Sequence, residues 1–190
     1  MRRTTLSIAI IALLAGCDRE PTVSGATPDR STARATTRPD ADVARDLATL
    51  RQVTAAFHDT ATSNRAGWSA RITKCMQLAG AGGMGFHYGN PHLIDGVARV
   101  DEPEVLLFEP EKNGTLRLVA VEYVVPYDAH SRDAEPPVLF GQQFKQNDAF
   151  KLWGLHAWVW KENTSGMFAD WNPTVNCDAT TEIEPAMAQH

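Results

Sequence analysis

Two cysteines 102 positions apart, Cys75 and Cys177, constrain the fold of this chain more than any other feature. The third cysteine, Cys17, directly follows an N-terminal apolar run and belongs to a different signal. In an oxidising compartment, the remaining pair favours a disulfide over two free thiols. That bond would close a loop of about 100 residues and stabilise the fold by up to about 4.7 kcal/mol in the chain-entropy model. Metal binding by the pair is a further alternative, although no CxxC spacing supports it.

The first 17 residues have the layout of a secretory signal. Arg2 and Arg3 precede an apolar run, residues 6–14, that is too short to span a bilayer. The small residues before Cys17 resemble the lipobox of bacterial lipoproteins, in which the cysteine is diacylated and becomes the first residue of the mature chain. We therefore expect a lipid anchor at Cys17, because acyl chains contribute about 0.8 kcal/mol per buried CH₂ to membrane binding. The alternative is an ordinary signal peptide with an incidental cysteine. The residues around the arginine pair do not support a twin-arginine signal.

The rest of the chain is predicted to be one domain between two polar ends. Residues 17–39 contain Thr, Ser, Ala, Pro, Arg and Asp with almost no large apolar side chain, which predicts a flexible tether. Residues 40–178 form the expected domain, and the acidic, polar residues 179–190 form the expected disordered tail. With 190 residues, 43% of them hydrophobic, the chain is long enough for one core and too short for two.

The charge of the chain argues against nucleic acid as a partner. Removal of residues 1–16 leaves 16 basic and 23 acidic side chains, a net charge of −7. Charges in residues 18–40 cancel, so the excess lies on the domain, and a negative domain repels phosphate backbones. No later segment approaches the roughly 18 uncharged apolar residues that a membrane span needs, so the lipid is the expected membrane contact.

Hydrophobic periodicity predicts an α+β fold. Asp40 can cap a helix in which apolar residues recur at three- and four-residue steps up to Ala61, ending before Gly67. Short apolar runs predict strands, at residues 84–88, 104–108, 115–125, 138–144 and 152–161. The Asn113-Gly114 turn between two of these runs indicates a hairpin. We expect this N-terminal amphipathic helix to pack on an antiparallel sheet of four to five strands.

Three polar side chains on different predicted strands are candidates for a shared site. Strand alternation places Glu122 on an otherwise apolar face, together with Leu116, Leu118, Ala120 and Val124. The same rule points His87 away from Met84, Phe86 and Tyr88, and it places His156 on a face with Trp158 and Trp160. A carboxylate buried among aliphatic side chains needs a partner, or it takes up a proton. We therefore hypothesise that Glu122, His87 and His156 converge.

The chemistry of such a cluster has several interpretations. Two imidazoles and one carboxylate can bind a polar ligand, act as an acid–base pair or hold a divalent metal. Alternatively, each histidine donates to a backbone carbonyl and Glu122 faces water at a sheet edge. No HxH or HExxH spacing supports a metal, so no cofactor is expected, and a divalent ion at His87, His156 and Glu122 is the minor alternative. No GxSxG motif marks a catalytic nucleophile.

Aromatic residues adjoin these positions in the sequence. Four of the five tryptophans lie in residues 152–177. Trp158, Trp160 and Trp171 can stack on a flat ligand if exposed, or cover the sheet if buried, where each ring buries about 150–250 Å². Tyr88 and Tyr123 directly follow His87 and Glu122 and are candidates for the same neighbourhood.

Two blocks of the sequence resemble a family of exported bacterial (lipo)proteins with no assigned activity. They are MGFHYGNP at 84–91 and HAWVWKENTSGMFADWNPTVNC at 156–177. The family pattern is MGxHYxNP followed by HxWxWxxNxxGMFxxWNPxVxC, with a cysteine upstream. The similarity covers residues 66–177, and Gly89 and Thr164 depart from it. The resemblance implies a site around the matching residues, which are His87, Tyr88, Asn90, His156, Trp158, Asn163, Trp171 and Asn172.

These patterns together predict an envelope lipoprotein, with the domain on the periplasmic face of a membrane. Its sheet and glycine-rich loop would form a small polar pocket around His87, Glu122 and His156 that binds a small ligand. The alternative from another class is a structural lipoprotein that presents its tryptophans to an envelope protein. A metal-binding or hydrolytic periplasmic enzyme is the third interpretation. Sequence patterns assign no oligomeric state.

Overall fold

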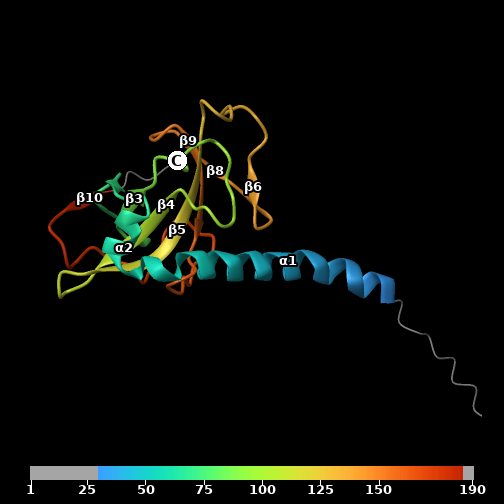
Figure 1. Ribbon diagram of the computed structural model, residues 1–190, viewed down its shortest axis with the longest axis horizontal. Coiled ribbons are helices and arrows are strands. Elements are labelled where there is room, and N and C mark those ends of the chain that lie inside the picture. The colour runs from blue at the N-terminus through green and yellow to red at the C-terminus, as the bar shows by residue number, and fades with distance from the viewer. Residues whose placement is uncertain (1–29, 186–190) are drawn as a thin grey trace, which may run out of the picture.

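A computed structural model describes residues 30–185 of the chain (Figure 1). The predicted signal, the lipidation site at Cys17 and most of the predicted tether lie outside the described residues. Three helical segments come first, α1 (Arg30–Thr54), η1 (Ala55–His58) and α2 (Thr60–Arg65). Ten strands follow within the described residues: β1 (Ala70–Arg71), β2 (Cys75–Leu78), β3 (Gly82–Gly89), β4 (Val105–Pro110), β5 (Leu116–Pro126), β6 (Val138–Leu139), β7 (Gln142–Gln143), β8 (Lys145–Asn147), β9 (Leu152–Ala157) and β10 (Ile183–Pro185).

Most of these strands form one sheet in the order β10-β2-β3-β4-β5-β9-β8, with β1 also paired to β3. All pairs in this sheet are antiparallel except β10 with β2, and β6 and β7 form a separate hairpin. The predicted α+β class with an antiparallel sheet is therefore confirmed. The sheet has eight strands rather than four to five, because the short strands at its edges mix polar and apolar residues and lack a recognisable apolar run.

The sheet has a buried core on each face. One core includes Leu50 of α1, which is fully buried against the sheet face that carries Val121 and Tyr123. The other core covers the opposite face and has these fully or almost fully buried members: Met84, Val105, Leu107, Val119, Ala120, Val124, Trp158 and Val175. Glu122 lies between Val121 and Tyr123 in the strand, so its side chain projects toward this second core.

A β-bulge in β5 changes which residues share the face of Glu122. Leu118 pairs with Phe108 and Ala120 pairs with Leu107, so Val119 is the extra residue. Beyond the bulge the alternation is reversed, and Leu118 packs in the core on the opposite face from Glu122. The prediction that Leu116 and Leu118 share the face of Glu122 was therefore wrong, because both pack outside the second core, whereas Ala120 and Val124 lie in it.

A second irregularity changes the face of Met84. The pairing of β2 with β3 shifts register beside Gly85, which has a φ of 83° and whose missing Cβ lets the backbone of Phe108 approach closely. As a result Met84 packs in the same core as Leu107, the cross-strand partner of His87. The prediction that Met84 points away from His87 was wrong for this reason.

The segment after β9 departs from strand alternation. The strand ends at Ala157, four residues earlier than predicted, and the Trp158 amide donates to the Met167 carbonyl at 2.9 Å. The Trp160 indole then donates to Thr54 Oγ1 at the end of α1 at 3.0 Å. Trp160 therefore does not share the face of His156, which corrects that prediction.

The two ends of the domain differ from the expected boundaries. The expected disulfide between Cys75 and Cys177 is present, and both cysteines are fully buried next to Phe86. It places the chain after Cys177 beside β2, where β10 pairs in parallel, so the predicted disordered tail contains a strand. At the other end, α1 begins at Arg30, within the predicted tether. None of the helices in the described part of the chain has the length and apolar character required to cross a bilayer.

Candidate functional site

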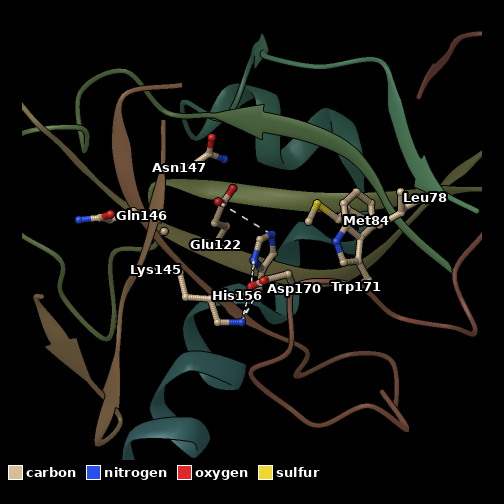
Figure 2. A pocket seen from close by; sticks show the side chains of 10 residues that line it. Leu78, Met84, Glu122, Lys145, Gln146, Asn147, His156, Asp170 and Trp171 are labelled. Atoms are coloured by element: carbon tan, nitrogen blue, oxygen red, sulfur yellow. Dashed lines mark hydrogen bonds and ion pairs between the residues drawn. The ribbon is translucent and has the colours of Figure 1, made fainter. Parts of the chain in front are cut away.

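A cavity of about 300 Å³ opens where β5, β9 and β8 meet the loop after β9 (Figure 2). Its wall includes two buried ionisable side chains, Glu122 and His156, and two that are more exposed, Lys145 and Asp170. Its lining consists of Leu78, Met84, Glu122, Lys145, Gln146, Asn147, Gly154, His156, Asp170 and Trp171. The cavity therefore combines carboxylates, an imidazole and an ammonium group with one aromatic ring.

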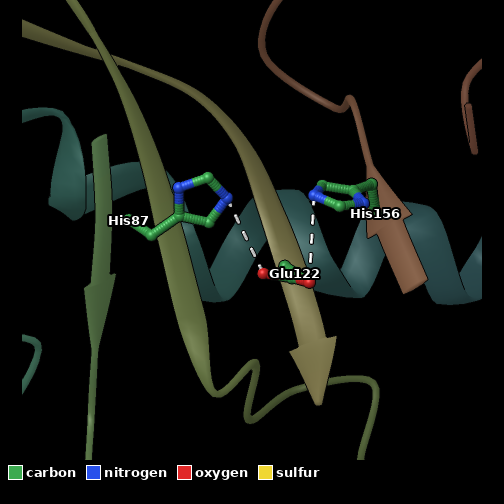
Figure 3. Close-up of side chains that lie close together, drawn as sticks. All are labelled: His87, Glu122 and His156. Atoms are coloured by element: carbon green, nitrogen blue, oxygen red, sulfur yellow. Dashed lines mark ion pairs between the residues drawn. The ribbon is translucent and has the colours of Figure 1, made fainter. Parts of the chain in front are cut away.

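At this wall, the side chains of His87, Glu122 and His156 lie together, with Glu122 between the two rings (Figure 3). Glu122 and His156 line the cavity, and His87 does not. Glu122 of β5 pairs directly with His156 of β9, and His87 comes from β3 on the far side of β4. His87 Nε2 is 3.8 Å from Glu122 Oε2, and His156 Nε2 is 3.9 Å from Glu122 Oε1. All three residues are at most 8% exposed, so the sequence hypothesis that they converge agrees with this geometry.

The other nitrogen of each imidazole has its own partner. His87 Nδ1 lies 2.9 Å from Thr73 Oγ1, and the same hydroxyl accepts the His87 amide at 3.3 Å. His156 Nδ1 lies 3.8 Å from Asp170 Oδ1, and Lys145 Nζ donates to both oxygens of Asp170 at 2.9 Å. Thr73 and Asp170 thus orient the two rings so that both Nε2 atoms face Glu122.

Burial and the mutual charges of the site set its protonation. Burial, followed by the charge of His156, lowers the pKa of His87 to about 3, so this ring is neutral. Burial also raises the pKa of Glu122; the charge of His156 opposes this shift, and the charge of Asp170 adds to it. For His156, burial opposes protonation, but the carboxylates of Glu122 and Asp170 outweigh it and raise the pKa.

The predicted aromatic residues are distributed between the site and the core. Trp171 lines the cavity, whereas Trp158 is 2% exposed, stacks on His156 and donates to the Ala169 carbonyl at 2.7 Å. Tyr123 is fully buried on the opposite face and donates to the Val100 carbonyl. Tyr88 packs edge-on against Phe108 and contacts the cores away from the cavity.

The three predicted asparagines organise turns outside the cavity. Asn90 accepts from the His92 amide, and Asn163 donates to the Trp171 carbonyl at 3.0 Å. Asn172 is fully buried and donates to the Glu162 carbonyl at 3.0 Å. None of them lines the cavity, but Asn163 and Asn172 hold the loop that carries Asp170 and Trp171.

Sequence reasoning missed Thr73, Lys145 and Asp170, which contact the histidines directly or through one another. Asp170 lies within the second matching block, and this was the only available sign of its role. Thr73 and Lys145 belong to short polar segments that no motif distinguishes.

Comparison with protein-family models, with curated proteins and with solved structures gave no match.

Proposed function

We propose that this protein is a lipoprotein of the bacterial cell envelope that binds a small polar ligand in the cavity beside Glu122 and His156. The observation that carries the proposal is the charged lining of this cavity. Glu122 and His156 are 8% and 6% exposed, and burying such groups costs free energy that hydrophobic side chains would not cost. Buried ionisable groups with shifted pKa values at a cavity are a common feature of functional sites.

The lining also indicates the chemistry of the ligand. Glu122 and Asp170 can accept hydrogen bonds, the Lys145 ammonium can donate them, and Trp171 offers a flat apolar surface. The volume of about 300 Å³ matches the lower end of ligand pockets, about 300–1,000 Å³. A molecule the size of an amino acid or a monosaccharide, with both donors and acceptors, fits these features.

The proposal includes a lipid anchor at Cys17 followed by a connection into α1 and the sheet. The N-terminal sequence supports the anchor, and the contacts at the end of α1 support packing of an amphipathic helix on the sheet. Leu50 is fully buried there, Arg51 donates to the Val159 carbonyl at 3.3 Å, and Thr54 accepts from Trp160.

Ligand binding is tested by purifying the protein from membranes and identifying co-purified molecules by mass spectrometry. Amino acids, monosaccharides and small amines are then screened for an increase in the melting temperature. A ligand found in this way should raise the melting temperature of the wild type and lose its effect in Lys145→Ala and Trp171→Ala. Lys112→Ala, in the exposed turn before β5, is the matched control. Absence of any ligand, or equal effects in all variants, would contradict the proposal.

The anchor is tested with Cys17→Ser in the full-length chain. The wild type should partition into detergent and yield an acylated N-terminal cysteine by mass spectrometry, whereas the variant should partition into water. An unmodified Cys17 in the membrane fraction would disprove lipidation.

A further inference from the structure

We propose that His87, Glu122 and His156 form a binding site for a divalent transition-metal ion of the zinc class. The three residues offer one donor atom each, and these atoms lie within 4.8 Å of one another. Two imidazoles and one carboxylate are a donor set that zinc and related ions accept. This inference goes beyond the ligand cavity and does not depend on ligand binding there.

The distances leave room for an ion between the side chains. Each imidazole Nε2 faces a different oxygen of Glu122, at 3.8 Å for His87 and 3.9 Å for His156. These separations are too long for direct hydrogen bonds. Zinc bonds of about 2.1 Å set donor atoms about 3.4 Å apart in a tetrahedral site. One donor atom from each residue lies within 4.8 Å of the others, so the widest separation has to close by up to about 1.4 Å when an ion binds.

The outer partners of both histidines match the arrangement that orients metal ligands. In a metal-bound imidazole, the N–H of the second nitrogen usually donates to a carboxylate or another oxygen. This contact fixes the ring and leaves the first nitrogen with a free lone pair for the metal. Thr73 Oγ1 occupies this position for His87 at 2.9 Å. On the corresponding side of His156 lies the carboxylate of Asp170, at an ion-pair distance of 3.8 Å from Nδ1. Both rings therefore present Nε2 to the carboxylate of Glu122.

An independent observation comes from unsatisfied hydrogen bonding. Over the residues that the structure describes, His156 Nε2 is buried without a hydrogen-bond partner. A buried polar atom in this condition is costly, and native folds usually satisfy it. A metal ion between His156 and Glu122 would give this nitrogen a partner.

The donor set and the cavity define the kind of ion and its open position. Calcium and magnesium prefer oxygen ligands only, whereas imidazole nitrogens favour zinc, cobalt and copper. Glu122 and His156 line the cavity, and His87 does not. The fourth coordination position would therefore face the cavity, where water or a polar ligand can reach it.

The first test is titration of the metal-free, disulfide-bonded protein with Zn²⁺ and Co²⁺ near neutral pH. We expect one ion per chain with micromolar or tighter affinity, and a visible Co²⁺ absorption spectrum typical of four or five ligands with nitrogen donors. No uptake at micromolar metal, or a spectrum of hexa-aqua cobalt, would overturn the proposal. Both readouts use the wild type and do not depend on the folding of a variant.

The second test uses variants of the three ligands. His87→Gln, His156→Gln and Glu122→Gln should each weaken zinc binding at least ~100-fold, and Thr73→Val and Asp170→Asn by ~10-fold or more. His92→Gln removes an exposed histidine outside the cluster and should bind zinc like the wild type. If the three ligand variants bound zinc as tightly as the wild type, the ion would lie elsewhere and the site would be refuted. Circular dichroism and the melting temperature of each metal-free variant report its folding.

The two proposals can fail separately. His87→Gln should abolish the metal site without changing the lining of the cavity, and Lys145→Ala should weaken the polar ligand without removing a metal donor. Loss of zinc binding in Lys145→Ala but not in His87→Gln would contradict the metal assignment and leave the ligand cavity intact.

Discussion

At the scale of single residues, Gly154 makes room for the carboxylate of Glu122. A Cβ atom at position 154 would lie 2.9 Å from Glu122 Oε1, which is closer than van der Waals contact allows. We expect Gly154→Ala to lower the free energy of unfolding by about 1 kcal/mol, at the low end for an added methyl group, because the displaced carboxylate is the end of a side chain that borders the cavity. Urea denaturation measures the change. The cost should shrink in a Glu122→Ala background, and an unchanged cost there would show that the strain arises elsewhere.

Glu104, which does not line the cavity, should make the free energy of unfolding depend on pH. It is 1% exposed, its Oε2 accepts the Val124 amide at 3.1 Å, and burial raises its pKa to about 8. The unfolded chain ionises this group near 4.5, so between about 4.5 and 8 the folded state holds a proton that the unfolded state has lost. Stability from this residue therefore falls as the pH rises through that window, by up to about 1.4 kcal/mol per pH unit, and then stays constant.

Glu104→Gln keeps an oxygen for the Val124 amide and removes the ionisation. The difference in unfolding free energy between this variant and the wild type should grow in favour of the variant from pH 5 to pH 8. Glu102→Gln, at a neighbouring exposed residue, should show no such trend. A constant difference for Glu104→Gln would mean that Glu104 ionises normally in the folded protein.

The sequence identified the centre of the site but not its surroundings. Glu122 could be found because a carboxylate on an apolar strand face requires a partner, and the histidines because each lies on a predicted strand. Asp170 and Lys145 could not be found in this way. They lie far apart in the sequence and meet only because the loop after β9 folds back beside β8.

At the scale of secondary-structure elements, β-bulges set the limit of prediction. Strict alternation is correct for Ala120, Glu122 and Val124, but it fails for Leu118 because Val119 is the extra residue of the bulge. This bulge arises from the pairing of β5 with β4, and no glycine in the sequence of β5 marks it. Element types were therefore easier to predict than the faces of individual side chains.

The loop between β9 and Cys177 is held by buried asparagine contacts. Asn172 is fully buried, donates to the Glu162 carbonyl and accepts the Thr174 amide at 2.9 Å, and its backbone pairs with Gly83 of β3. We expect Asn172→Ala to lower the free energy of unfolding by about 1–3 kcal/mol for each buried group left without a partner.

Chemical denaturation tests this expectation, with Asn113→Ala as the matched control. Asn113 also accepts a backbone amide two residues ahead, but it is exposed, so its replacement should change stability by less than about 0.5 kcal/mol. Similar effects of the two substitutions would show that burial of the Asn172 contacts contributes little.

At the scale of the whole molecule, the Cys75–Cys177 disulfide joins β2 to the end of this loop. We expect the double replacement Cys75→Ala and Cys177→Ala to lower the free energy of unfolding by about 2–5 kcal/mol, because the bond restricts the unfolded chain. Urea denaturation measures it, with Cys17→Ser as the control that leaves the bond intact. If a reducing agent leaves the wild-type transition unchanged, this expectation is wrong.

The overall architecture was predictable in its main lines. Cysteine counting found the disulfide, and apolar runs found β3, β4, β5 and β9. The edge strands escaped prediction because their pairing depends on neighbours rather than on their own sequences. β10 is an example, since it lies in a polar tail and pairs with β2 only after Cys177 has brought it there.

The position of His87 behind Glu122 has a consequence for access. Glu122 and His156 form part of the cavity wall, whereas His87 lies deeper, on the other side of the carboxylate. A molecule the size of a sugar can therefore touch two members of the cluster, and only a particle as small as an ion, a proton or a water can reach all three. The size of a molecule that enters the cavity therefore decides whether it can contact the imidazole of His87.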